Sequence, residues 1–246
     1  MHDLVGLEEV ALCESVSGDL EVVNSEDLTD IDLLCLTSVG GVLRLEDNLA
    51  LTALDGLSGV QDVGDLLVKN NDGLVDMGGL SGVTTVEGEL WLQGNDALDT
   101  LDGFDGLQSV RESLRIKNHD ALQNVTGLMN LASVGQHLYI KENASLVHVE
   151  GLVGLAEIGG ALQVSVNDAL VDIDGLSNVT TVGEDLRIRA NPALISLAGL
   201  QGITSVGGDL AIEDNASLCQ TDAEAWAASI DVGGTVTVAD NTGDCP

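Results

Sequence analysis

A unit of 23 or 24 residues recurs along most of this chain, and it constrains the fold more than any other feature. In the stretch LQVSVNDALVDIDGLSNVTTVGED, residues 162–185, apolar and polar side chains first alternate, an Asn follows, and apolar residues then recur at every third position until a Gly. A spacing of three matches neither the 3.6-residue period of a helix nor the two-residue period of one long strand. It is typical of a chain wound into coils whose short sides each place one side chain inward, so the sequence predicts a solenoid.

A polar residue marks each of ten coils. The marker column consists of Ser25, Asn48, Asn71, Asn95, His119, Asn143, Asn167, Asn191, Asn215 and Asn241. We expect these Asn side chains to point inward at the end of a strand, where the amides bond backbone groups and the Asn residues of neighbouring coils. His119 is then a substitute hydrogen-bonding residue rather than a ligand. The alternative is that the column holds surface turn formers.

The residues five and three positions before each marker are apolar in every coil, which predicts inward-pointing strand positions with outward positions between them. The predicted strands span 18–23, 41–46, 65–69, 89–93, 113–117, 137–141, 161–165, 185–189, 209–213 and 235–239. The predicted fold class is all-β, a right-handed parallel β-helix or leucine-rich-repeat-like solenoid of about ten coils. We expect neither antiparallel hairpins nor helices in the middle coils.

The ends of a solenoid must differ from its middle, because a bare end exposes the core. We expect a single solenoid domain over 1–246, made of an irregular N-terminal cap 1–17, repeats 18–218 and a C-terminal cap 219–246. Thr221 and Glu224 have the spacing of a capping box, and Ala-rich sequence follows them. This pattern predicts a short helix over 221–230 that lays Trp226 over the last full coil.

The four cysteines fall near the two ends of the array. Cys219 and Cys245 each lie four residues after a marker, so they occupy one column in adjacent coils. Cys13 and Cys35 are 22 residues apart and lie in nearly one column. Adjacent coils place Cα atoms about 5 Å apart, which suits a disulfide. We therefore predict the pairs Cys13–Cys35 and Cys219–Cys245, which imply an oxidising compartment.

The chain carries a formal net charge of −33, and this excludes nucleic acid and anionic membrane as partners of the whole surface. No apolar run reaches membrane-spanning length. The first residues, MHDLVGLEEVALC, lack the basic start and long apolar stretch of a secretion signal, so we expect that a signal is absent or already removed. The composition suits a protein of an extracellular or salty setting.

Positive charge gathers on the outward strand positions, which hold seven of the eight Lys and Arg residues and only three acids. Between Trp91 and Arg189 these positions contain no acid. One column places Arg115 between Trp91 and Tyr139, a geometry for cation–π contact, and the other places Lys117 beside Lys141. Adjacent like charges destabilise a sheet, so an anionic or polar ligand would relieve them.

The ligand-binding residues predicted on this face are Trp91, Arg115, Lys117, Tyr139, Lys141, Gln163, Arg187 and Arg189. Aromatic and Arg residues dominate binding hot spots, which favours this interpretation. The alternative is that long amphipathic side chains simply cover the sheet, while flanking acids neutralise them.

The repeat units resemble a known family. Segments such as VGGDLAIEDNASL (206–218) and VGQHLYIKENASLVHVEGL (134–152) resemble the receptor L-domain repeat, a leucine-rich right-handed β-helix, and the L-domain-like repeats of bacterial and fungal surface proteins. The ending NASLCQTDAEAW resembles that family's Asn-x-x-Leu-Cys motif followed by a Trp-bearing cap helix. The resemblance covers about residues 16–246 and implies extracellular recognition or wall-associated structure. This chain lacks a Cys-rich module, a kinase and a membrane span, so receptor signalling is not carried over.

Signals for catalysis are weak. The outward strand positions show no paired carboxylates, and the sequence contains no Ser-His-Asp order, P-loop or HExxH motif. His137 and His148 fall in different columns, and no CxxC cluster occurs, so we expect no metal site and no cofactor.

The predicted function is a non-enzymatic extracellular or cell-surface module that binds a polar or anionic glycan or protein, as a monomer or as part of a larger surface protein. One alternative is a purely structural repeat, such as a stalk. A less favoured one is a β-helix polysaccharide lyase.

Overall fold

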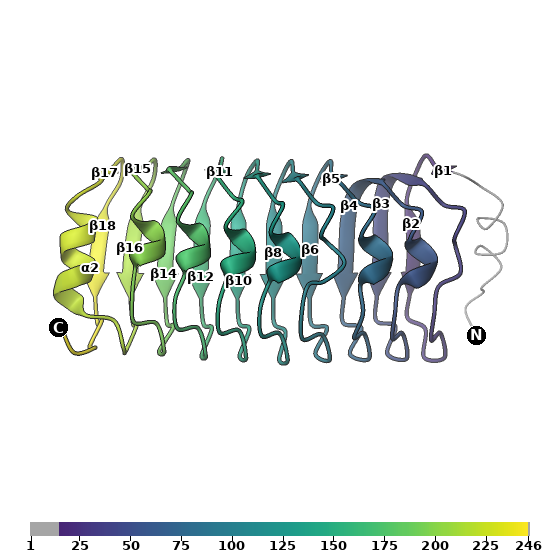
Figure 1. Cartoon of the computed structure of the whole chain (residues 1–246), viewed down its shortest axis with the longest axis horizontal. Coiled ribbons are helices and arrows are strands. Elements are labelled where there is room, and N and C mark those ends of the chain that lie inside the picture. Colours follow the sequence, from purple (N-terminus) through teal and green to yellow (C-terminus); the bar gives the residue numbers. More distant parts are fainter. Residues whose placement is uncertain (1–14, 246) are drawn as a thin grey trace.

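The computed structural model describes residues 15–245, which wind into a rod of stacked coils (Figure 1). Ten long strands form one side of the rod. They are β2 Leu20–Val23, β3 Ser38–Glu46, β4 Asp62–Lys69, β6 Leu90–Gln93, β8 Leu114–Lys117, β10 Leu138–Lys141, β12 Leu162–Ser165, β14 Leu186–Arg189, β16 Leu210–Glu213 and β18 Val236–Ala239. Each lies within or overlaps a strand that the alternation predicts.

In the described chain, eight coils also contain a two-residue strand, and six contain a single 3₁₀ turn. The short strands are β1 Ser15–Val16, β5 Thr85–Val86, β7 Ser109–Val110, β9 Ser133–Val134, β11 Glu157–Ile158, β13 Thr181–Val182, β15 Ser205–Val206 and β17 Asp231–Val232. The 3₁₀ turns are η1 Asp55–Leu57, η2 Gly78–Leu80, η3 Thr126–Leu128, η4 Glu150–Leu152, η5 Asp174–Leu176 and η6 Ala198–Leu200. β3 and β4 run through both strand positions of their coils.

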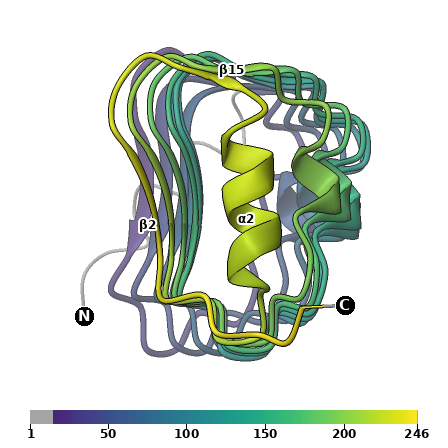
Figure 2. The same ribbon diagram turned by 90° about the vertical axis from the view of Figure 1, so that its left-hand side faces the viewer.

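All of the named strands pair in parallel, each with its counterparts in the neighbouring coils. The one antiparallel contact in the described chain is an isolated bridge between Cys219 and Thr242. Seen from the C-terminal end, the chain runs down the long-strand side, crosses the base and rises through the 3₁₀ turns, so the coils are right-handed (Figures 1 and 2). The predicted right-handed parallel solenoid of ten coils is therefore confirmed.

The inward columns form one continuous aliphatic core. Leu114, Leu138 and Leu162 lie opposite one another in successive strands and are fully buried. The apolar residues spaced by three, such as Leu170 and Ile173, are buried as well. Each coil thus covers the apolar face of the next, which is how a solenoid with few aromatic residues removes its side chains from water.

The marker residues form the predicted inward ladder. Asn143 donates a hydrogen bond from Nδ2 to the Ile116 carbonyl at 3.1 Å, and its backbone N–H and Nδ2 both reach Oδ1 of Asn167 at 3.1 and 3.2 Å. The same pattern joins Asn167 to Asn191. The surface-turn alternative is wrong, because these Asn side chains are fully buried.

Several details differ from the sequence predictions. The middle coils do contain helical residues, but only as three-residue 3₁₀ turns, which are too short to show a 3.6-residue period. Strand pairing begins at Ser15, inside the predicted irregular cap 1–17, because β1 pairs with β3. The cap helix α2 spans Gln220–Ala227 rather than 221–230.

The C-terminal cap agrees with the other expectations. Trp226 packs against the core, and its indole N–H donates to the Leu200 carbonyl at 3.3 Å. Cys219 and Cys245 form a disulfide with Cα atoms 5.0 Å apart, as predicted. The predicted pair Cys13–Cys35 includes Cys13, which lies outside the described residues, so that pair stays a prediction. No helix within residues 15–245 is long and apolar enough to cross a membrane.

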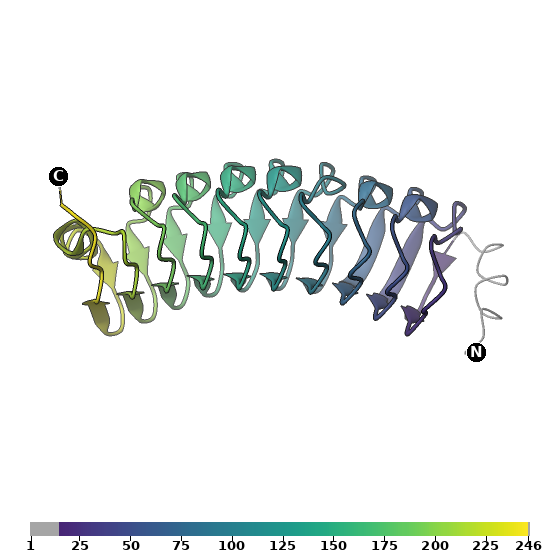
Figure 3. The same cartoon turned by 90° about the horizontal axis from the view of Figure 1, so that it is seen from below.

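The rod bends gently (Figure 3). The 3₁₀ turns lie on the convex side and the long strands on the concave side. Concave strand surfaces of curved solenoids are extended and accessible to large ligands. The predicted binding face therefore lies on the concave side.

Candidate functional site

The centre of the concave face is a stack of aromatic and cationic side chains. The register places Arg115 of β8 opposite Trp91 of β6 and opposite Tyr139 of β10. Its guanidinium carbon lies 5.0 Å from the Trp91 ring centre and 5.5 Å from that of Tyr139. Both distances fall within the range of cation–π attraction, so the two rings hold the guanidinium between them.

The stack extends beyond these three residues on both sides. The Lys69 ammonium lies 4.6 Å from the Trp91 ring centre, and Trp91 donates its indole N–H to Gln93 at 3.0 Å. On the other side, the His137 ring stacks on Tyr139 with centres 5.5 Å apart. Because each aromatic ring touches two neighbours, the stack limits the rotamer freedom of its members, and a ligand would meet a pre-ordered surface.

The second outward column places two ammonium groups side by side. Lys117 lies opposite Lys141 in the paired strands. Lys117 has an ion-pair partner, Glu142, at 3.3 Å. Within residues 15–245, Lys141 is the only Lys or Arg side chain that makes no ion pair. The Lys141 charge is therefore not compensated by an ion pair, and it can attract an anion.

These two columns surround a shallow hollow of about 230 Å³. Its lining consists of Trp91, Arg115, Lys117, Tyr139, Lys141 and Gln163. The structure thus brings six of the eight predicted ligand-binding residues around one space. Arg187 and Arg189 lie farther along the same face on β14 and pair with Gln163 and Ser165 of β12 in the strand register.

Acidic side chains at the strand ends neutralise much of the positive charge. Glu89 contacts Arg115 through Nε, Asp185 contacts Arg187 at 2.6 Å, and Glu213 contacts Arg189. Burial raises the pKa of Glu89, although the neighbouring Arg115 lowers it. Glu213 is one of the three acids already counted on the strand positions, but Glu89 and Asp185 lie outside them, so the face is less positive than that count predicts.

Sequence reasoning missed Glu89, His137 and Asp185 as members of this face. Each directly precedes a long strand, so its side chain is on the same side as the outward residue two positions later. Extending the alternation by one more step would have found them. Lys69 occupies an outward strand position in β4, but its contact with Trp91 does not follow from the sequence, because that contact depends on the rotamers of both side chains.

The lining of the hollow is mainly cationic and aromatic. Its six lining residues include no carboxylate, and the nearby Glu89 is occupied by Arg115. What the arrangement offers is cationic donors and flat aromatic surface.

No protein-family model matches this chain, and a search of curated proteins finds no relative. A functional assignment therefore rests on the residues and geometry described above.

Proposed function

We propose that this protein is a non-enzymatic recognition module whose concave strand face binds an acidic glycan of the extracellular or cell-surface environment. The observation that carries the proposal is the hollow lined by Arg115, two aromatic rings and two adjacent Lys side chains. Aromatic rings stack on the apolar faces of sugars, and Arg and Lys donate to carboxylate or sulfate groups.

The location of the hollow supports the same interpretation. It lies at the middle of the concave side, where a polymeric ligand can follow the strand face across several coils. Arg187 and Arg189 continue the cationic face beyond the hollow, and their side chains are 34% and 42% exposed. A ligand longer than the hollow would reach them.

The extracellular assignment is part of the proposal. The Cys219–Cys245 disulfide supports it, since disulfides persist in oxidising compartments. The right-handed parallel coils and the Trp-bearing cap helix support the proposed kinship with receptor L-domain-like surface proteins. The proposal includes an acidic protein segment as a second ligand, because the same cations would attract its carboxylates.

A purely structural role, such as a stalk, is the second candidate function. The observation in its favour is that seven of the eight Lys and Arg side chains already have acidic partners within the protein. In that case the cations and their acids serve to cover the strand surface and keep it soluble.

A glycan array that includes uronate-bearing and sulfated polymers tests the proposal. We expect the wild-type protein to bind at least one acidic class, with weaker binding at higher salt because the charges are partly exposed. The double variant Arg115→Ala/Tyr139→Ala should lose at least about tenfold in affinity, which corresponds to 1.4 kcal/mol. A parallel assay for depolymerisation of uronate polymers tests the lyase alternative.

The matched control is Arg111→Ala. Arg111 is exposed, pairs with Glu87 at 3.0 Å and lies outside the concave face, so this variant removes the same charge without touching the hollow. Binding that survives the double variant unchanged, or an array with no acidic ligand, would favour the structural role. Turnover that depends on the face residues would overturn the non-enzymatic assignment.

A further inference from the structure

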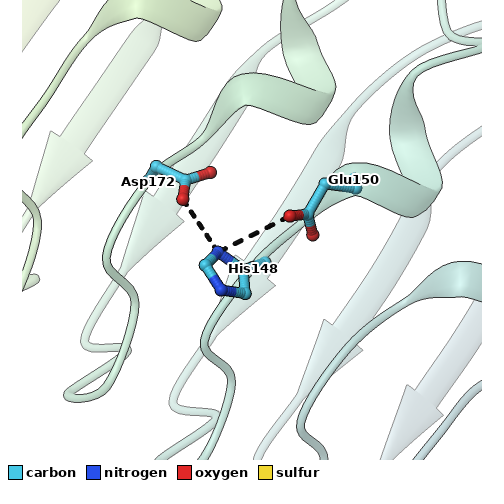
Figure 4. Close-up of side chains that lie close together, drawn as sticks. All are labelled: His148, Glu150 and Asp172. Atoms are coloured by element: carbon cyan, nitrogen blue, oxygen red, sulfur yellow. Dashed lines mark hydrogen bonds and ion pairs between the residues drawn. The ribbon is translucent and has the colours of Figure 1, made fainter.

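A second cluster of polar side chains lies away from the concave face, where the chain leaves the base of the coil and enters a 3₁₀ turn. His148 precedes η4, Glu150 is the first residue of that turn, and Asp172 occupies the column of His148 in the next coil (Figure 4). The His148 Nδ1 atom lies 2.8 Å from Oδ2 of Asp172 and 3.6 Å from Oε1 of Glu150. We propose that these three residues bind a divalent transition-metal ion of the zinc class.

The column of His148 shows that this histidine departs from the structural role of its neighbours. In other coils the equivalent side chain accepts a hydrogen bond from the backbone N–H two residues later, at the start of the 3₁₀ turn. The accepting side chains and the donating backbone N–H groups are Asp76 with Gly78, Asn124 with Thr126, Asp172 with Asp174, and Ser196 with Ala198. The His148 ring instead turns toward the next coil and faces a carboxylate. The repeat itself does not require a histidine here.

Asp172 both accepts the hydrogen bond that the repeat requires and faces His148, and it does so through different oxygen atoms. Its Oδ1 accepts from the Asp174 N–H at 3.2 Å, while Oδ2 faces His148. The hydrogen bond at Oδ1 fixes the orientation of the carboxylate. In known metal sites, hydrogen-bond partners of the ligating side chains orient those ligands in the same way. Oδ2 is thus presented to an ion by an anchored side chain.

The geometry of the donor atoms suits a small cation. One atom from each of the three side chains can be chosen so that all lie within 4.8 Å of one another. A tetrahedral zinc ion with bonds of about 2.0–2.2 Å separates its ligand atoms by roughly 3.3–3.6 Å. The observed separations of 2.8 and 3.6 Å from Nδ1 bracket this value, so small side-chain rotations create the site.

Imidazole nitrogens and carboxylate oxygens both bind zinc, and zinc sites with three protein ligands keep the fourth position open. A metal-binding imidazole is neutral, so the ring that holds the ion through Nδ1 carries its hydrogen at Nε2. The fourth position faces solvent, because the His148 and Glu150 side chains are 41% and 56% exposed. Water fills it, or a donor atom from a second molecule.

The electrostatic surroundings favour a cation at this place. Within the described part of the chain, Glu150 and Asp172 have no Lys or Arg partner, and His148 alone faces them. The protein as a whole carries a net charge of −33, which concentrates cations near its surface. The sequence predicts no histidine metal site, because His137 and His148 fall in different columns. The structure instead brings to His148 one carboxylate from its own coil and one from the next.

Calorimetric titration of the metal-free full-length protein with Zn²⁺, together with the visible absorption of bound Co²⁺, tests the proposal. We expect one saturable equivalent that is lost in His148→Asn and weakened at least tenfold in Asp172→Asn. Both replacements keep the fold, because Asn124 occupies the same column and makes the capping bond that the repeat needs. Zn²⁺ should also raise the melting temperature of the wild type but not that of His148→Asn.

The control variant is His137→Gln, which removes the other partly exposed histidine of the described chain. This variant should still bind one equivalent of Zn²⁺. His2 lies outside the described residues, so the decisive quantity is the difference between the wild type and His148→Asn. Equal binding by these two proteins, or no saturable binding by the wild type, would show that His148 and Asp172 form only an ion pair.

Discussion

At residue 119 the buried Asn ladder passes through a histidine. Nδ1 of His119 accepts a hydrogen bond from the Asn95 backbone N–H at 3.2 Å, and His119 in turn donates its own N–H to Asn143. The Leu92 carbonyl interacts with the ring, but Nε2 is buried and makes no hydrogen bond of good geometry within the described chain. Burial lowers the pKa of His119 from 6.5 to about 4. The ring is therefore neutral in the fold, and one buried polar atom is left poorly satisfied.

The variant His119→Asn should restore the ladder and remove a pH-dependent loss of stability. In the unfolded chain the His119 side chain binds a proton below about pH 6.5, whereas in the fold it does so only below about pH 4. The wild type should therefore lose stability relative to the variant as the pH falls through this window, by roughly 2–3 kcal/mol at pH 4.5. Urea unfolding of both proteins at pH 7 and pH 4.5 measures this difference, and an unchanged difference would contradict it.

The residue before each marker adopts a left-handed conformation, and at one position this residue is valine. Val166 has φ 59°, a conformation that is strained for a β-branched side chain. Asn occupies the same column at Asn24, Asn70 and Asn118 with φ between 52° and 58°. Asn tolerates this conformation far better, because its short polar side chain bonds locally.

Replacing Val166 with Asn should therefore stabilise the protein by about 1 kcal/mol. The matched control is Val153→Asn, since Val153 is similarly exposed but has φ −60° and relieves no strain. Thermal unfolding of both variants measures the effect. A melting temperature of Val166→Asn at or below that of the control would show that the left-handed conformation is not strained.

At the scale of the element, the 3₁₀ turns depend on a glycine at their second position. In η2 a Cβ atom added to Gly79 would lie 1.7 Å from the Leu54 carbonyl oxygen of the preceding coil. A Cβ on the adjacent Gly78 would meet only the flexible Asp76 side chain, at 3.0 Å. The equivalent of Gly78 in η6 is Ala198. The turns can thus stack only because the second position has no side chain.

We expect Gly79→Ala to destabilise the protein by roughly 2–4 kcal/mol, because two backbones must move apart within a packed core. Gly78→Ala, one residue away in the same turn, should change the stability by no more than about 0.5 kcal/mol. Chemical denaturation compares the two variants. Equal stabilities would mean that the turns are not packed as closely as the structure shows.

The elements also show why some features follow from the sequence and others do not. The inward columns and the ladder are predictable, because stacking places equivalent residues of every coil in one environment. The 3₁₀ turns are not, since three residues leave no helical period. Helix α2 begins one residue earlier than predicted, at Gln220, whose side chain bonds Asn241 and the Val238 carbonyl. It ends three residues earlier than predicted, at Ala227.

The binding face shows the same contrast. Its residues follow from alternation, and the register confirms that Arg115 lies between Trp91 and Tyr139. The ion pairs that reduce its charge, such as Glu89 with Arg115, depend on side chains that reach in from the strand ends. Such contacts require the positions of long side chains, which periodicity does not specify.

At the scale of the whole molecule, stability comes from contacts between neighbouring coils. The core runs without interruption from Leu20 in β2 to Ala227 in α2. In such arrays each coil interacts only with its neighbours, so damage to one central interface weakens the entire rod. The concave face adds little to this core, because its side chains lie outside the coils. In the proposed function, the inward faces of the strands provide stability and their outward faces provide recognition.

The most direct test is to compare the unfolding free energies of two double variants, one of outward side chains in β8 and β10 and one of inward side chains in β10. Arg115→Ala/Tyr139→Ala removes outward side chains and should cost about 1–2 kcal/mol in total, including the lost cation–π contact. Leu138→Ala/Ile140→Ala removes their fully buried neighbours and should cost several times more, since each opens a cavity worth roughly 2–5 kcal/mol. If the two double variants prove equally destabilised, the inward and outward columns are misassigned, and the binding face derived from them is wrong as well.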